Sequence, residues 1–227
     1  MAALSHHKHD ASHDHHDHHE DDHGHALPYK EQLRANRLGL WLFCVSELFL
    51  FGALLAARFY LWRDPVLGSI RPELSQNVAL VTTVILLVSS YFMVRAEVAA
   101  GYGDWKKMDN SLVVTFVLGL IFLLGVVIIE WGTMPGLAKA ITGETHLLRP
   151  GDGPLGAVFF MMTGFHALHV IIGLVFIGTV IRNGRNGKYT VEKHWGVESC
   201  AIYWHFVDVV WIFFYPAIYL IGTAFPL

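Results

Sequence analysis

Six titratable side chains lie within or at the edge of long apolar stretches of the sequence: Glu47, His166, His169, Glu198, His205 and Asp208. Ionisable groups inside a membrane span are costly, so each requires a partner or a function. Glu47 is the tenth residue after Arg37, in a stretch that is otherwise uncharged up to Arg58, which places it near the middle of a span. Two interpretations of Glu47 are equally supported. In one, Glu47 exchanges a proton, contacts water or lines a lipid cleft; in the other, it is a neutral carboxyl group that is hydrogen-bonded between helices.

A polar stripe is predicted on the last apolar stretch, with His205 and Asp208 at its centre. Residues that share its helical face are Glu198, Ile212, Tyr215 and Tyr219. Such a face is expected to look into the helix bundle or at another subunit rather than at lipid. His205 and Asp208 are three residues apart, which is close enough to pair on a helix. The pattern indicates an intramembrane polar network that fixes helix packing, and it leaves a catalytic or ligand-binding role open.

His166 and His169 repeat the three-residue spacing in the fourth apolar stretch. Two imidazoles on one helix face suggest a metal site, but Gly164 and Gly173 beside them favour close helix contact instead. With His205 they are the only histidines in the apolar stretches, which is too few for a haem–copper centre. A di-iron site requires Glu-x-x-His motifs, and the apolar stretches contain none. We therefore predict no catalytic residue and no metal site in the membrane part of the chain.

The first 25 residues are rich in histidine and aspartate, and they determine the sign of the net charge. Lys8 opposes six carboxylates there, giving −5, whereas the remaining residues sum to +2. Residues 1–30 are predicted to be a disordered cytoplasmic tail, because they hold too few apolar side chains to fold. The alternative is weak binding of Zn, Ni or Cu, or proton buffering, by His6, His7, His9, His13, His15, His16, His18, His19, His23 and His25.

The composition excludes an ordinary soluble enzyme. Of the 227 residues, 54% are hydrophobic and 15% are charged, against about 25% charged in a typical soluble domain. The net charge of −3 and the lack of a basic patch exclude a nucleic-acid partner. Two cysteines, Cys44 and Cys200, cannot form a disulfide framework and are expected to be small core residues.

Five stretches are long enough to cross a bilayer, which takes about 20 apolar residues. We predict an all-α polytopic membrane bundle within residues 31–227, with transmembrane helices near 38–61, 76–95, 110–131, 155–181 and 199–222. The tail has no apolar signal-peptide core, so the first helix is expected to direct insertion.

The distribution of basic residues predicts a cytoplasmic N-terminus and an outer C-terminus. In that orientation the outer side carries five basic residues, Arg58, Arg63, Arg71, Lys139 and Arg149, and the other eleven lie inside, as the positive-inside rule requires. Lys106 and Lys107 then lie in an inner loop, where they are expected to meet anionic lipid.

Several motifs resemble subunit III of the haem–copper oxidases, the cytochrome c oxidase type. The run His194–Glu198 followed by Tyr203–Trp211 resembles the last helix of that family, and it is long and unusual. Phe160–Gly173 is similar to the preceding helix, Ser46 with Glu47 to a glutamate-bearing helix, and Gly103–Met108 to an inner loop. The similarity covers roughly residues 34–224, in a short version with five helices where many members have seven.

The resemblance implies an accessory subunit of a complex that reduces oxygen to water and pumps protons. Such a subunit contacts subunit I directly, with subunit II, and a small subunit IV where one is present, as further partners. Haem and copper then belong to partner subunits, while this chain binds structural phospholipid, stabilises the catalytic subunit and supports proton uptake. The resemblance further implies a multi-pass protein of a bacterial-type cytoplasmic membrane. It matches Glu47 to the buried glutamate near the lipid cleft, and Glu198, His205 and Asp208 to polar positions of the last helix.

Departures and alternatives remain. The two helices missing relative to longer members are expected to leave an open groove for lipid or another subunit. The family usually pairs its residue at the Glu130 position with a tyrosine and a nearby glutamine. Here Trp131 follows Glu130 and the span has no glutamine, so no role is assigned to Glu130. Subunit III of a quinol oxidase and the related accessory protein of nitric oxide reductase are the alternative functions. A stand-alone metal transporter that uses the tail as a collector is a third, although transporters commonly show repeats and broken mid-membrane helices.

Overall fold

The computed structural model describes residues 29–63, 76–142, 149–151 and 153–221, so residues 1–28 of the predicted tail, with the ten histidines of its alternative metal site, lie outside the described residues. In chain order the helices are α1 (Tyr29–Arg63), α2 (Gln76–Gly101), α3 (Trp105–Leu124), the π-helix η1 (Gly125–Glu130), α4 (Pro135–Thr142), α5 (Gly153–Arg185), α6 (Trp195–Tyr215) and the π-helix η2 (Pro216–Leu220). Five of the described helices are long and apolar enough to cross a membrane. The predicted all-α class with five spans is confirmed.

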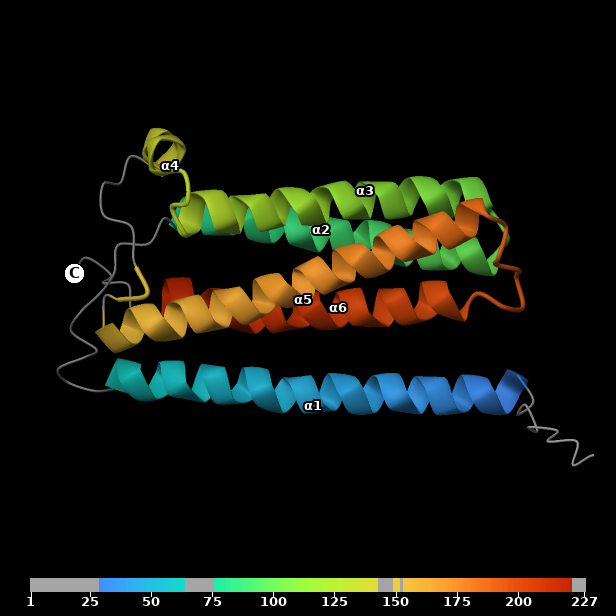
Figure 1. The fold of residues 1–227 in the computed structure, drawn as a ribbon, viewed down its shortest axis with the longest axis horizontal. Coiled ribbons are helices and arrows are strands. Elements are labelled where there is room, and N and C mark those ends of the chain that lie inside the picture. Colours follow the sequence, from blue (N-terminus) through green and yellow to red (C-terminus); the bar gives the residue numbers. More distant parts are fainter. Residues whose placement is uncertain (1–28, 64–75, 143–148, 152, 222–227) are drawn as a thin grey trace, which may run out of the picture.

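The bundle has three parts. α5 and α6 lie in the middle, the α2–α3 pair covers one side, and α1 lies on the other (Figure 1). The last span is the most enclosed, with 56% of its apolar window buried, whereas only 11% of the corresponding window of α1 is buried. α1 is therefore a peripheral helix, and most of its apolar surface faces outward.

The helices extend beyond the apolar stretches that predicted them. α1 begins at Tyr29, nine residues before the expected position, and α2 continues to Gly101, six residues further than expected. Charged residues do not end a helix that leaves the hydrocarbon layer, because their long side chains reach the polar surface while the backbone bonds continue. α2 ends instead where Gly103 adopts a positive φ of 76°, and α3 begins where the Asp104 carboxylate accepts the backbone N–H of Lys107.

Two tryptophans of α6 fix the centre of the bundle. The indole Nε1 of Trp204 donates to the Ser89 hydroxyl at 3.0 Å, and that of Trp211 donates to the Thr83 hydroxyl at 2.9 Å. Both tryptophans are almost completely buried. Buried indole N–H groups need a partner. The two tryptophans are seven residues apart and their partners six, about two helical turns in each case, so α2 supplies both acceptors.

The expected close helix contact occurs at Gly173 but not at Gly164. A Cβ atom at Gly173 would lie 2.9 Å from two ring carbons of Trp204, whereas one at Gly164 would meet Trp131 only at 4.0 Å. On the other edge of the same indole, a Cβ at Gly119 of α3 would lie 2.6 Å from Cη2. Trp204 thus joins α3 and α5 because both helices lack a side chain where the ring passes.

One end of the bundle is basic. The start of α1, the α2–α3 turn and the α5–α6 loop meet there, on the right of Figure 1. Its described cations are Lys30, Arg34, Arg37, Arg95, Lys106, Lys107, Arg182, Arg185, Lys188 and Lys193. We call it the basic end. At the opposite end the described basic residues are Arg58, Arg63, Lys139 and Arg149.

Candidate functional site

Glu47 of α1 and His169 of α5 form an ion-pair contact about halfway along α1. The Oε2 atom of Glu47 lies 3.2 Å from Nε2 of His169, and the two side chains are 21% and 8% exposed. Phe51 packs edge-on against the imidazole at 4.9 Å between ring centres. The structure thus gives Glu47 a partner on another helix, 122 positions along the chain, which sequence spacing did not predict.

The hydrogen bonds of His169 define how many protons this contact holds. Its Nδ1 lies 2.8 Å from the carbonyl oxygen of Phe165, and since a carbonyl only accepts, Nδ1 carries a hydrogen. The contact between Nε2 and the carboxyl group then needs one further proton, which sits on either partner. In both forms the pair has no net charge, which makes it tolerable at this depth.

His166, one turn before His169, serves a different purpose. Its ring is 1% exposed and stacks on Trp211 with 4.7 Å between ring centres, while Phe122 meets it edge-on at 5.8 Å. Neither ring nitrogen has a hydrogen-bond partner in the described part of the chain. The two imidazoles therefore diverge, with His169 bound to α1 and His166 packed among aromatic rings of α3 and α6.

The expected pair of His205 with Asp208 is wrong. His205 Nδ1 lies 2.6 Å from the hydroxyl of Ser90 on α2, whereas both carboxyl oxygens of Asp208 are buried without a partner among the described residues. The stripe on α6 also does not face inward throughout, since Ile212 is 47% exposed. Three-residue spacing brings two side chains to one face, but Ser90 offers His205 a better-placed partner.

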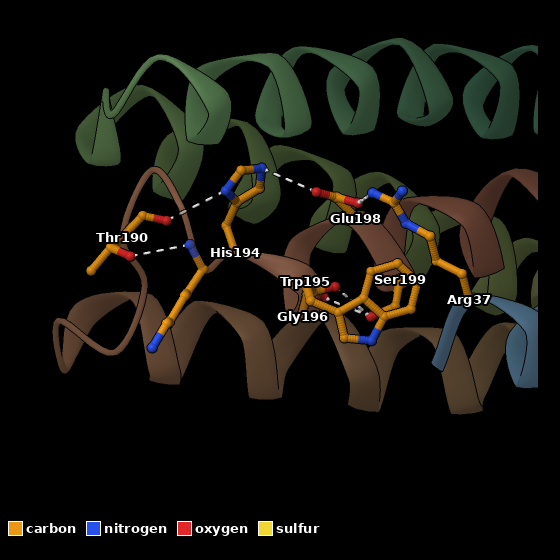
Figure 2. Close-up of polar contacts among 8 residues, drawn as sticks. Arg37, Thr190, His194, Trp195, Gly196, Glu198 and Ser199 are labelled. Carbon is orange, nitrogen blue, oxygen red and sulfur yellow. Dashed lines mark hydrogen bonds and ion pairs between the residues drawn. The ribbon is translucent and has the colours of Figure 1, made fainter. Parts of the chain in front are cut away.

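Glu198 lies at the basic end rather than deep in the bundle. Figure 2 shows its carboxylate between Arg37 of α1 and His194, with distances of 2.7 Å to the Arg37 Nη2 and 3.3 Å to the His194 Nε2. The Arg37 guanidinium also lies over the ring of Trp195, 5.7 Å from its centre. On the other side of His194, its Nδ1 faces the Thr190 carbonyl oxygen at 3.4 Å.

α1 is attached to the bundle by polar contacts at three levels. Arg37 binds Glu198 near one end, Glu47 meets His169 in the middle, and Arg58 donates to the carbonyl oxygen of Ile221 at 2.8 Å near the other end. Arg37 and Arg58 were not predicted as contact residues. Arg37 and Arg58 lie ten and eleven residues from Glu47, about three helical turns in each direction. This spacing puts the three side chains on one face of α1, and it is the sequence feature that could have predicted the contacts.

The serine and threonine partners on α2 were missed as well. The Thr83 hydroxyl is hydrogen-bonded to Trp211, that of Ser89 to Trp204, and that of Ser90 to His205. Small hydroxyl residues in an apolar stretch are common, so their presence did not indicate which of them face α6.

Among the described residues, no group of three or more His, Cys, Asp or Glu side chains is placed to hold a metal ion. Cys44 and Cys200 are free and buried, as expected.

The fold and the placement of its ionisable groups define a multi-pass helical membrane protein whose polar side chains join its own helices. A family model for cytochrome c oxidase subunit III matches residues 21–223. Cytochrome c oxidase subunit 3 of Oryctolagus cuniculus is 36% identical over 208 residues, which is 88% of this chain and 74% of the relative. Those of Dugong dugon and Rattus norvegicus, with the same coverage, are 34% and 35% identical.

The chain therefore belongs to the cytochrome c oxidase subunit III family. The resemblance drawn from the motifs is confirmed, and the chain is a component of a multi-subunit oxidoreductase complex in a membrane.

Proposed function

We propose that this chain is the accessory subunit III of a proton-pumping haem–copper terminal oxidase of the cytochrome c type. It holds no redox centre, stabilises the catalytic subunit I, binds lipid and supports proton uptake. The observation that carries the accessory role is the use of the buried polar groups: the Trp204, Trp211 and His205 contacts each join two helices of this chain. Polar side chains that are hydrogen-bonded between helices of the same chain make the bundle rigid, and a rigid bundle can support a neighbouring subunit.

The proton-related part of the proposal rests on Glu47 and His169. Their contact holds one proton and is 21% exposed on the Glu47 side, so water or a neighbouring subunit can reach it. The outer face of α1 beside it is apolar and open, with Trp41 57% and Phe49 77% exposed. We assign this face to phospholipid or to another subunit, in the position of the two helices that longer members possess.

The proposed orientation sets the basic end in the cytoplasm of a bacterial-type cytoplasmic membrane, with N-terminus in and C-terminus out. Subunit I is the direct partner, with subunit II, and a small subunit IV where present, in the same complex. Haem and copper belong to those partners. We propose structural roles for His166, which packs among aromatic rings, for Glu198, which binds Arg37 and His194 at the basic end, and for the buried Asp208.

A pair of substitutions at Glu47 tests the role of the contact in the purified complex. In Glu47→Gln the amide N–H can still donate to His169 Nε2, so the contact persists without a transferable proton, whereas Glu47→Ala removes it. We expect Glu47→Gln to assemble with normal haem spectra, to reduce oxygen at a modestly lower rate, and to lose activity sooner during turnover. Glu47→Ala should in addition lower the amount of this chain in the complex. Glu31→Gln, at the exposed start of α1, is the matched control.

Two outcomes would contradict the proposal. Abolished oxygen reduction by Glu47→Gln with intact haems would mean that this chain takes part in the chemistry itself. Co-purification with a nitric oxide reductase and no oxidase would assign the chain to that related complex. A quinol oxidase is distinguished by the electron donor that the purified complex accepts.

A further inference from the structure

Two surface grooves flank the turn between α2 and α3 at the basic end. One, of about 360 Å³, is lined by Phe92, Arg95, Asp104, Lys106, Lys107 and Val114 with two further polar residues. The other, of about 410 Å³, is lined by Tyr91, Val94, Arg95 and Val98 of α2, by Tyr102 of the following turn and by Lys107. Because Arg95 and Lys107 line both grooves, the two form one continuous cationic surface around the turn.

The three cations of this surface are not ion-paired within the part of the chain that the structure describes. Arg95, Lys106 and Lys107 form no ion pair with any other residue that the structure describes, whereas Arg185 of the same end binds Asp109 through two hydrogen bonds. Asp104 is the one carboxylate that lines the grooves, and it accepts the backbone N–H of Lys107 at 3.1 Å. An anionic oxygen group would therefore find three exposed donors here.

Toward the middle of the bundle the same surface becomes apolar. Tyr91, Val94 and Val98 are 64%, 45% and 52% exposed along one face of α2. The 26 residues of α2 span about 39 Å, roughly 9 Å more than the hydrocarbon layer. With Gln76 at one edge of the hydrocarbon layer, Arg95 lies about 28 Å further along α2, at the other edge, and its long side chain can extend to the lipid phosphates.

We propose that Arg95, Lys106 and Lys107 bind the phosphate of an anionic phospholipid whose acyl chains lie along the exposed apolar face of α2. The forked guanidinium of Arg95 suits two phosphate oxygens, and the lysines add point charges. A dissolved phosphate would use the cations alone. The proposal deepens the lipid binding proposed above by naming the lipid class and its position, and it rests on that proposal only for the bilayer around the chain.

The test uses the full chain in nanodiscs of phosphatidylcholine that contain a trace of spin-labelled phosphatidylglycerol or of spin-labelled phosphatidylcholine. The measured quantity is the preference for the anionic label in the immobilised fraction. Arg95→Gln/Lys107→Gln is compared with Arg182→Gln/Lys188→Gln, which removes the same charge from exposed residues of the same end that line neither groove. Each cation near anionic lipid strengthens binding roughly fivefold.

We expect the groove variant to lose the preference roughly tenfold or more, the matched variant to lose less than about threefold, and Arg95→Lys/Lys107→Arg to retain most of it. Equal losses in the groove and matched variants would overturn the proposal, since the effect would then be one of net charge. Displacement of the label by millimolar inorganic phosphate would overturn it too, since the acyl chains would then contribute nothing.

The folded state of each variant is checked by its thermal unfolding midpoint. If the double substitution unfolds the chain, Lys106→Gln and Lys107→Gln carry the test singly, with a roughly fivefold loss expected for each. Subunit content and haem spectra of the complex are measured separately, so a failed lipid site and a failed accessory role are told apart.

Discussion

A single methyl group at Gly173 is expected to destabilise the bundle through Trp204. Its Cβ would lie 2.9 Å from Cε3 and Cζ3 of the indole, inside van der Waals contact. The ring cannot withdraw, because Gly119 meets its other edge and its Nε1 is bound to Ser89. Gly173→Ala therefore forces either a shift of α5 or the loss of a buried hydrogen bond.

The magnitude follows from two opposing effects. Ala is favoured over Gly inside a helix by about 1 kcal/mol, while overpacking a close-packed interior costs about 1–3 kcal/mol. Gly178→Ala, on the same helix, is the matched control because its nearest neighbour, Phe116, lies at 4.0 Å. The control variant gains only the helix preference of Ala over Gly, so the two variants should differ in stability by the overpacking cost. For a chain of this size that cost corresponds to a difference of about 2–12 °C in the unfolding midpoint.

The assay is thermal unfolding of the full chain in mild detergent, followed by circular dichroism. A second pair of variants carries Trp204→Phe, whose smaller ring leaves space at Gly173 and should shrink the difference to less than half. Midpoints for Gly173→Ala and Gly178→Ala that agree within about 1 °C would refute the wedge role of Trp204. An undiminished difference in the Trp204→Phe background would assign the effect to another contact.

Three further outcomes are expected. Deleting residues 1–25 should leave assembly and turnover intact, and loss of either would give the tail a role. Arg37→Gln should lower the unfolding midpoint only slightly, since the contact with Glu198 is half-exposed and such pairs contribute about 1 kcal/mol or less; a fall above about 10 °C would show that this contact holds α1 in place. His205→Ala should lower the amount of this chain in the purified complex before it alters oxygen reduction, as should Ser90→Ala to a smaller degree; normal subunit content with lost proton pumping would contradict a packing role.

The sequence predicted the number of spans because each apolar stretch is bounded by charges, and a bilayer of fixed thickness demands a fixed length. It did not predict where the helices end. α2 continues past Arg95 because Ala96 and Ala100, both fully buried, still pack on the bundle. Helix ends depend on such packing and on turn residues such as Gly103, whereas the apolar pattern reports only the hydrocarbon layer.

The candidate site shows the same division between sequence and tertiary structure. By itself the sequence determined which ionisable groups enter the membrane, namely Glu47, three histidines and Asp208, because each interrupts an otherwise apolar stretch. Only the tertiary structure decided their partners: Glu47 meets His169, His205 meets Ser90, and His166 packs on Trp211. Local spacing specifies a shared face of one helix. The contacts of Glu47 and His205 instead join residues more than a hundred positions apart, and which residues meet depends on how the helices cross.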